Sequence, residues 1–266
     1  MRNKLCKSMM AISIILIPLL FSYVSAQQKQ TKSGDGLVYI IRGQANLELG
    51  QYDQAISEFT KALKIDPRNA LAYSSRGLAY ELKGQYDQAI SDYTKAIEID
   101  PRDALTYRGR GDAYGEKGQY DQAISDYNKA IEIDPRDALT YGCRGDAYRK
   151  KGQYDQAISD YNKAIEIDPK NADAYNNLAW FLATVKTSSL RNGKKAVELA
   201  LTACELSNWK NPGYLDTLAA AYARTGDFNN AVKWQAKALE SPELGKKPEA
   251  QQRFKFYKER KPWPAD

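Results

Sequence analysis

The sequence predicts an all-α protein, a solenoid of helix-turn-helix repeats that is closed by a C-terminal capping helix. The first observation is a heptapeptide, Gly-Gln-Tyr-Asp-Gln-Ala-Ile, which starts at Gly50, Gly84, Gly118 and Gly152. The second is its interval of 34 residues, a period that is typical of stacked helix pairs. The third is that small and aromatic side chains recur at helical spacing inside each interval, ahead of an Asp-Pro pair.

The first 26 residues have the features of a secretory signal peptide. Basic residues up to Lys7 precede an almost wholly apolar stretch, 9–24, and the small residue Ala26 suits cleavage. The apolar stretch is shorter than the roughly 20 residues of a membrane-spanning helix. We therefore expect export, either to a periplasm or out of the cell, with cleavage after Ala26; a retained membrane anchor is the alternative. Residues 27–35 are polar and are expected to form a flexible tail.

The charge balance does not favour nucleic acid as a partner. The chain has 39 Lys and Arg against 33 Asp and Glu, and three of the basic residues lie in the signal peptide, so the mature chain carries 36 against 33, a net charge of +3. No basic stripe with interleaved aromatic side chains remains. Histidine is absent from the sequence, which excludes a Ser-His-Asp triad and any His-ligated metal site. We expect no catalytic residues, no metal and no cofactor.

Cys143 and Cys204 are the cysteines of the mature chain. Export would permit a disulfide, but the repeat register places Cys143 on the first helix of one repeat and Cys204 on the second helix of the next. Those helices are not direct neighbours in a stack of helix pairs, and a disulfide needs Cα atoms within about 7 Å of each other. Cys204 stands where other repeats have isoleucine, so we expect it to be a core residue.

The repeat that begins at Ala70 illustrates the predicted helix pair. Gly84 suits the left-handed conformation that ends a first helix, and Pro101 cannot continue a second one. Gly77 and Ala89 are small, as residues must be where two helices cross closely. The residues that define the pair are Tyr73, Gly77, Tyr80, Gly84, Tyr86, Ala89, Tyr93, Ala96 and Pro101.

This pattern resembles the tetratricopeptide repeat (TPR) family, whose aromatic, Gly, Tyr, Ala and Pro positions recur at the same spacing. The resemblance implies a right-handed superhelical array in which first helices line a concave groove and second helices face outward. The last two units are degenerate. An amphipathic segment, 247–260, with Ala250, Phe254 and Tyr257 as its stripe, is predicted to cap the array. The array itself spans 36–240 in six units: 36–69, 70–103, 104–137, 138–171, 172–211 and 212–240.

Arginine occupies a position at which the family usually has leucine, in four successive units. We expect each of these guanidinium groups to lie at the edge of the groove, near an acidic neighbour. The four residues are Arg42, Arg76, Arg110 and Arg144.

The first helices differ between units, whereas the second helices of the second, third and fourth units are nearly identical. Because the resemblance places the first helices at the groove, we interpret their variation as adaptation to a partner; recent duplication followed by chance change is the alternative. The groove is predicted to be apolar at its N-terminal end and charged further along. Trp180 is either an anchor for the partner or packed against its own repeat. The candidate partner-binding residues are Ile40, Leu71, Leu78, Arg108, Asp112, Asp146, Arg149, Asn176 and Trp180.

These features together favour a non-catalytic, exported scaffold that binds a peptide segment or a partner protein in its groove. Neither nucleic acid nor, after signal cleavage, a membrane is expected as a partner. A structural homo-oligomer that uses the groove or an end of the array is the alternative, and a recruitment module of an envelope enzyme is a further one. Some family members clamp chaperone C-termini with Lys and Asn, and the loss of these types argues against such a partner. The matching positions hold Ile40, Gln44, Ser75, Leu105 and Gly109.

Overall fold

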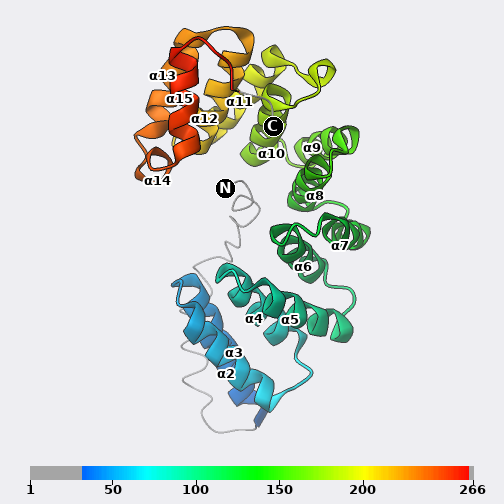
Figure 1. The fold of residues 1–266 in the computed structure, drawn as a ribbon. Coiled ribbons are helices and arrows are strands. Elements are labelled where there is room, and N and C mark those ends of the chain that lie inside the picture. Colours follow the sequence, from blue (N-terminus) through cyan, green and yellow to red (C-terminus); the bar gives the residue numbers. More distant parts are fainter. Residues whose placement is uncertain (1–31, 264–266) are drawn as a thin grey trace. The chain divides into compact units, whose positions relative to one another are not determined.

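The computed structural model describes residues 32–263, and every regular element in that range is a helix (Figure 1). The predicted signal peptide lies outside the described residues. The first helix, α2, begins at Lys32, so residues 32–35 belong to a helix rather than to the tail that we expected. The chain divides into two compact units, with the boundary between Arg136 and Asp137.

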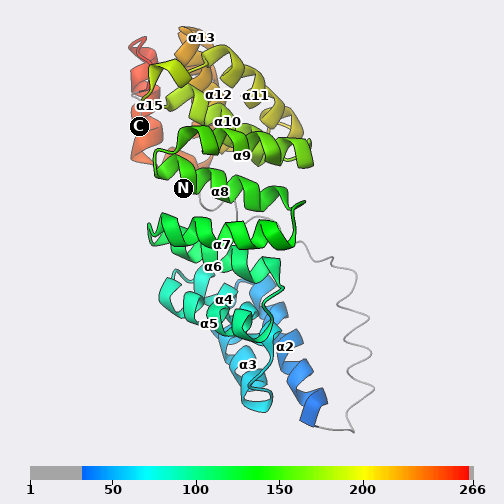
Figure 2. The ribbon, with the colours of Figure 1, turned by 90° about the vertical axis from the view of Figure 1, so that its right-hand side faces the viewer.

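Unit 1 contains three helix pairs that match the first three predicted repeats. Each first helix packs against the second helix of its own pair, and α4 and α6 also pack against the second helix of the preceding pair. Figure 2 shows these helices from a second direction. Their bounds are α2 Lys32–Glu48, α3 Tyr52–Ile65, α4 Ala70–Leu82, α5 Tyr86–Ile99, α6 Ala104–Glu116 and α7 Tyr120–Ile133.

Unit 2 contains three more pairs and two terminal helices. The connection between the two helices of the fifth repeat contains a short 3₁₀ helix, η1, Ser188–Leu190. The helices are α8 Ala138–Lys150, α9 Tyr154–Ile167, α10 Ala172–Thr184, α11 Gly193–Leu206, α12 Pro212–Thr225, α13 Phe228–Leu239, α14 Pro242–Gly245 and α15 Pro248–Lys258.

Local sequence signals explain where the helices start and stop. An Asn or Asp side chain caps the first helix of each repeat from the second onward; the Asn69 carboxamide oxygen, for example, accepts a hydrogen bond from the backbone N–H of Ala72 at 2.9 Å. Gly84 ends α4 with φ +74°, a conformation that costs glycine little. Asp100 leaves the helical region directly before Pro101, as the sequence predicted.

The two helices of a repeat cross where a glycine of the first faces an aromatic ring of the second. A Cβ atom added to Gly111 would lie 2.7 Å from Cε1 of Tyr127, and one added to Gly145 would lie 2.8 Å from Cε1 of Tyr161. Both rings are almost fully buried. A side chain at either glycine would therefore force the helices apart, which is why the sequence keeps a hydrogen atom there.

Three of the four repeated arginines, Arg76, Arg110 and Arg144, lie between helices and bind the expected acidic neighbours, whereas Arg42 is exposed. The Arg110 guanidinium donates two hydrogen bonds to the Asp126 carboxylate, at 2.7 and 2.8 Å, and Nη1 donates a third to Oγ1 of Thr94 at 3.1 Å. Thr94 belongs to the preceding repeat. The same three bonds recur one repeat earlier, where Arg76 binds Asp92 and Thr60. The guanidinium groups of Arg76 and Arg110 thus each join their own second helix to that of the repeat before it.

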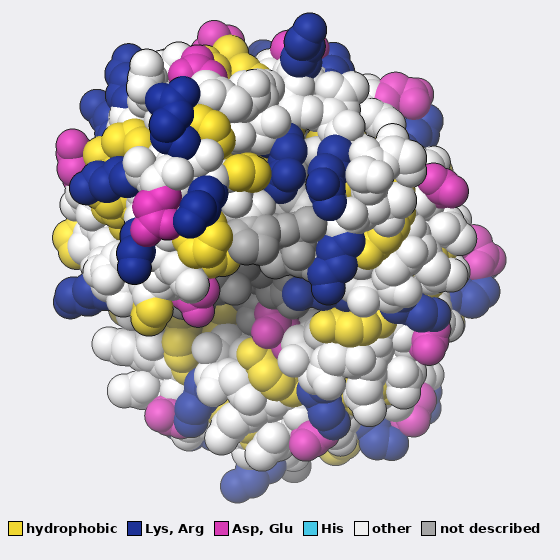
Figure 3. All heavy atoms as spheres, turned by 45° about the horizontal axis from the view of Figure 1, so that its top comes forward, with side chains coloured by type: hydrophobic (Ala, Val, Ile, Leu, Met, Phe, Trp, Pro, Cys, Tyr) yellow, Lys and Arg dark blue, Asp and Glu magenta, His cyan; other side chains and the backbone are white. Residues whose placement is uncertain are grey.

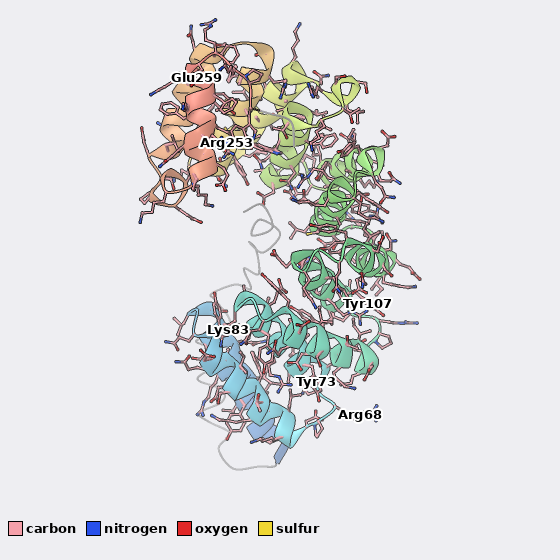
Figure 4. All side chains as sticks on the ribbon, viewed as in Figure 1. Arg68, Tyr73, Lys83, Tyr107, Arg253 and Glu259 are labelled. Carbon is pink, nitrogen blue, oxygen red and sulfur yellow. The ribbon has the colours of Figure 1, made fainter. Side chains whose placement is uncertain are left out.

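A second set of ion pairs crosses the same boundary. Lys83, at the end of α4 (Figure 4), pairs with Asp53 of α3, and Lys117, at the end of α6, pairs with Asp87 of α5. The aspartates are largely exposed to solvent. Such exposed pairs stabilise a fold only slightly, but they show which surface of each first helix faces the preceding repeat.

Cys204 is a free and fully buried thiol on α11. It therefore forms no disulfide with Cys143, and it occupies the core position that the repeat register predicted. Burial raises the pKa of the Cys204 thiol to about 12, with a smaller contribution from neighbouring Glu205.

Replacement of Gly111 tests the helix crossing. We expect Gly111→Ala to lower the free energy of unfolding by about 1 kcal/mol or more, because the new methyl group overpacks against Tyr127. The matched control is Gly142→Ala, also within a first helix, where an added Cβ meets nothing within 4 Å. That change should stabilise the protein by up to about 1 kcal/mol through helix propensity. Urea unfolding followed by circular dichroism measures both; equal midpoints for the two variants would contradict the crossing.

The buried thiol gives the protein a specific alkaline sensitivity. An unfolded chain loses the thiol proton near about pH 8.5, whereas the folded chain keeps it to about pH 12. Above pH 8.5 the unfolded state therefore binds fewer protons, and stability should fall by about 1.4 kcal/mol per pH unit from this group alone. Between pH 8.5 and 9.5 the parent should lose about 1 kcal/mol more than Cys204→Ala. Parallel stability curves for the two proteins would show that the thiol ionises normally.

Candidate functional site

The first helices of unit 1 expose leucine at the same repeat position three times. Leu37, Leu71 and Leu105 follow one another at intervals of one repeat, and their side chains are 54%, 52% and 52% exposed. More than half of each side chain is therefore available to a partner. Leu78 and Leu82 continue the same face of α4 and are partly exposed. We call these five residues the leucine surface.

The leucine surface belongs to an exterior of mixed character. In the view of Figure 3, hydrophobic side chains reach the surface between basic and acidic ones. Scattered exposed leucines are ordinary on a protein surface. Leucines that are repeated in register along neighbouring helices are not scattered, and they mark a candidate interaction site.

Arg108 and Asp112 of α6 lie near a tyrosine of the preceding repeat. The Tyr93 hydroxyl donates a hydrogen bond to the Glu81 carboxylate at 2.9 Å, in a buried setting. Burial raises the pKa of Tyr93, Glu81 and Asp112 raise it further, and Arg108 lowers it. Asp112 also accepts a hydrogen bond from the Tyr127 hydroxyl at 2.8 Å. These two predicted groove charges are thus close together and form part of a network inside unit 1.

Asp146 and Arg149 form a similar network in unit 2. The Tyr161 hydroxyl donates to Oδ1 of Asp146 at 2.8 Å, and the Arg149 guanidinium donates to the same oxygen at 3.4 Å. Nδ2 of Asn177 reaches the other carboxylate oxygen at 3.5 Å. The side chains of Asp146 and Arg149 are each 14% exposed. They stabilise the packing of α8 with its neighbours and present little surface to a ligand.

Three predicted groove residues are buried, and the prediction that they face a partner needs correction. Ile40 is 4% exposed and packs in a core cluster with Phe59. Asn176 is 2% exposed, and its Nδ2 lies 3.5 Å from Oδ1 of Asn177. Trp180 is 5% exposed and is therefore packed in the core, but its core cluster is formed with α12, α13 and α15 rather than with its own repeat, as the packing alternative had it. The repeat register treats all units alike, so it did not show that these three positions are buried.

Trp180 is covered by the C-terminal helix of its own chain. The Arg253 guanidinium projects from α15 (Figure 4) and lies 5.4 Å from the centre of the Trp180 ring and 5.5 Å from that of Trp263. Its Nε and Nη2 atoms donate to the Asp216 carboxylate at 2.9 and 2.8 Å. Gln235 donates to the same carboxylate at 2.8 Å. The C-terminal end of the first-helix face is therefore occupied by the chain itself.

Helix α15 packs against α13 and α12, within the segment predicted to cap the array. Ala250 and Tyr257 are fully buried, as the predicted stripe required, but Phe254 is partly exposed and Arg253 is buried in its place. A buried arginine needs a carboxylate partner. The sequence offered no sign that Asp216, 37 residues earlier, would supply it.

Comparison with known proteins places the chain in the tetratricopeptide repeat family. Residues 43–84, 111–148 and 145–180 match a family model described as TPR repeat. Residues 70–103, 92–125 and 213–241 match models described as tetratricopeptide repeat. Because these matches run through most of both units, the chain belongs to this family. A comparison with curated protein sequences gave no match.

Solved structures of TPR proteins are similar to this chain. A crystal structure of MamA is 28% identical with a TM-score of 0.55, over 63% of this chain and 95% of MamA. A Pseudomonas aeruginosa pilF structure is 19% identical with a TM-score of 0.69, over 84% and 98%. Cut9, from the Cut9–Hcn1 hetero-tetramer of APC/C, is 18% identical with a TM-score of 0.77, over 91% and 46%. The last two likenesses show the fold alone.

None of the helices described between residues 32 and 263 has the length and apolar character that a bilayer crossing requires. The same residues contain no group of three or more Cys, Asp or Glu side chains arranged to hold a metal ion.

Removal of Arg253 tests the cap. We expect Arg253→Ala to destabilise unit 2 by about 3–5 kcal/mol, because it leaves the buried Asp216 carboxylate without its ionic partner. Lys255→Ala, on the exposed side of the same helix, is the control and should change stability by less than about 0.5 kcal/mol. Thermal unfolding followed by tryptophan fluorescence measures both. Equal melting temperatures for the two variants would show that the Arg253–Asp216 pair does not hold the cap in place.

Proposed function

We propose that this protein is an exported, non-catalytic scaffold that binds a partner protein through the first helices of unit 1. The observation that carries the proposal is the leucine surface. A side chain that remains more than half exposed contributes little burial to the fold, so its apolar area is available to a partner. Three leucines at one repeat position offer evenly spaced contacts to a single bound segment.

The partner that suits this surface is a protein segment with apolar side chains followed by charged ones. Leu71, Leu78 and Leu82 give α4 an apolar face, while the neighbouring helix α6 carries Arg108 and Asp112. Each half-exposed leucine that a partner covers would contribute about 1 kcal/mol, since burial of a fully exposed side chain contributes about 1.5–3 kcal/mol. Asp112 is already bonded to Tyr127 and Arg108 lies close enough to Tyr93 to lower its pKa, so their role is to set the orientation of the segment rather than its affinity.

Export rests on the N-terminal sequence. A basic start, an apolar stretch and small residues ahead of Gln27 support cleavage after Ala26. The partner would then be a protein outside the cytosol. The homo-oligomer that the sequence left as an alternative would form through a different surface of unit 1.

A comparison of two surface variants tests the scaffold. The baits are the chain recovered from exporting cells, whose first residue should be Gln27, and two variants. Leu37→Ser/Leu71→Ser/Leu105→Ser should lose the specific prey, since each serine removes exposed apolar area without disturbing the core. Leu206→Ser, an exposed leucine of unit 2, should keep it. Quantitative mass spectrometry of cross-linked envelope proteins gives the result; identical prey for all three baits would contradict the proposal.

A further inference from the structure

One face of α2, the first helix of the array, has no described helix packed against it, whereas the same face of α4 and of α6 does. In the second and third repeats, that face packs against the second helix of the preceding repeat. The bonds of Arg76 to Thr60 and of Lys83 to Asp53 identify it in α4. The corresponding face of α2 has the spacing i, i+4, i+7 and i+11. It consists of Val38, Arg42 and Ala45 of α2 together with Leu49, which directly follows the helix.

Burial differs sharply between equivalent positions. Ala72 and Ala79 of α4 are fully buried, whereas Val38 and Ala45 of α2 are partly exposed. Leu49 is 71% exposed, the highest value among the large hydrophobic side chains of the described residues. Arg42 is also exposed. The described chain therefore leaves a helix face open whose small residues are buried at the equivalent positions of α4 and α6.

The identity of residue 49 makes this face unlike its counterparts. The next three repeats have lysine at the equivalent position, namely Lys83, Lys117 and Lys151, and two of these lysines form the ion pairs already described. Leu49 replaces that charge with an apolar side chain. Terminal repeats of soluble solenoids usually present a polar outer face to water. Leu49 instead makes the outer face of α2 more apolar, and such a face suits an apolar partner.

We propose that the α2 face binds the same face of a second copy of this chain, and that the two copies form a head-to-head dimer. The opposite end of the array is closed in unit 2, where α15 packs on α13 and Arg253 is buried against Asp216. A head-to-tail stack of copies would need that end to be open. Contact between two identical N-terminal faces is closed after two copies, because it is isologous.

The face is self-complementary when two α2 helices pack antiparallel. With the two-fold axis beside the middle of the face, Leu49 of one copy lies opposite Val38 of the other. Ala45 at the centre lets the backbones approach. Arg42 then comes within side-chain reach of Glu48 on the other copy, and Glu48 is exposed. Apolar contacts thus lie at both ends of the contact, with opposite charges between them.

The size of the face sets the expected affinity. A helix of 17 residues is about 26 Å long. Contact along one such helix buries less than the roughly 800 Å² per partner of a standard interface. We therefore expect a dimer that dissociates on dilution to low micromolar concentration and forms near 100 µM. This association is independent of the leucine surface, since it uses another side of α2 and involves neither α4 nor α6.

The test compares the full chain, expressed with its own leader, with two lysine variants by light scattering after size-exclusion chromatography. Leu49→Lys restores the residue that later repeats carry, so it should fold normally and remain monomeric at 100 µM. Leu206→Lys, an exposed leucine of α11, is the control and should dimerise like the parent. Leu71→Ser/Leu105→Ser should also dimerise, which separates this proposal from the partner-binding one.

Two results would overturn the dimer. A parent protein that is monomeric at 100 µM would mean that the α2 face does not bind a second copy. A dimer that survives Leu49→Lys would place the contact elsewhere on the molecule. Circular dichroism of Leu49→Lys, which should match that of the parent, excludes misfolding as the cause of a lost dimer.

Discussion

The whole arrangement depends on one packing constraint: within a unit, a first helix is held between two second helices, its own and that of the repeat before it. Glycine and alanine allow a first helix to pack closely against its own second helix, as Gly111 does against Tyr127. Arginine and lysine bind the first helix to the second helix of the preceding repeat, as Arg110 does with Thr94. The same residue types therefore recur every 34 positions because each repeat must satisfy both neighbours with one helix.

A helix at either end of such an array lacks one of these neighbours, and the two ends of this chain differ in what covers them. Unit 2 adds α15, whose buried Arg253 neutralises Asp216 and covers Trp180. A buried ion pair of this kind stabilises little compared with apolar packing, but it is costly to break and specifies one docking register for the cap. Unit 1 instead begins with α2, whose outer face carries Leu49 where a lysine would follow the pattern. One end is thus closed by the chain, and the other is shaped for a contact beyond the described residues.

Much of this fold was predictable because it follows from residues that repeat. The period, the cap residues, Gly84 and the Asp-Pro pairs fix the helix bounds within a residue or two, and the buried position of Cys204 follows from register alone. The site was less predictable. Burial of Ile40, Asn176 and Trp180 depends on contacts that do not repeat, such as the one between Trp180 and Arg253, a residue 73 positions later. A signal for Leu37 and Leu105 was present, since both share the register of Leu71.

The polar residues of the first helices also need a different interpretation from the one their variation suggested. Asp112 and Asp146 receive hydrogen bonds from Tyr127 and Tyr161 of their own repeats, so changes at these positions alter internal bonds as well as any surface. Their variation is therefore not a direct measure of adaptation to a partner. An exposed leucine does not stabilise the fold in this way, because its side chain buries little area and forms no hydrogen bond. For this reason the constant, exposed leucines are stronger evidence of a binding surface than the variable, bonded charges.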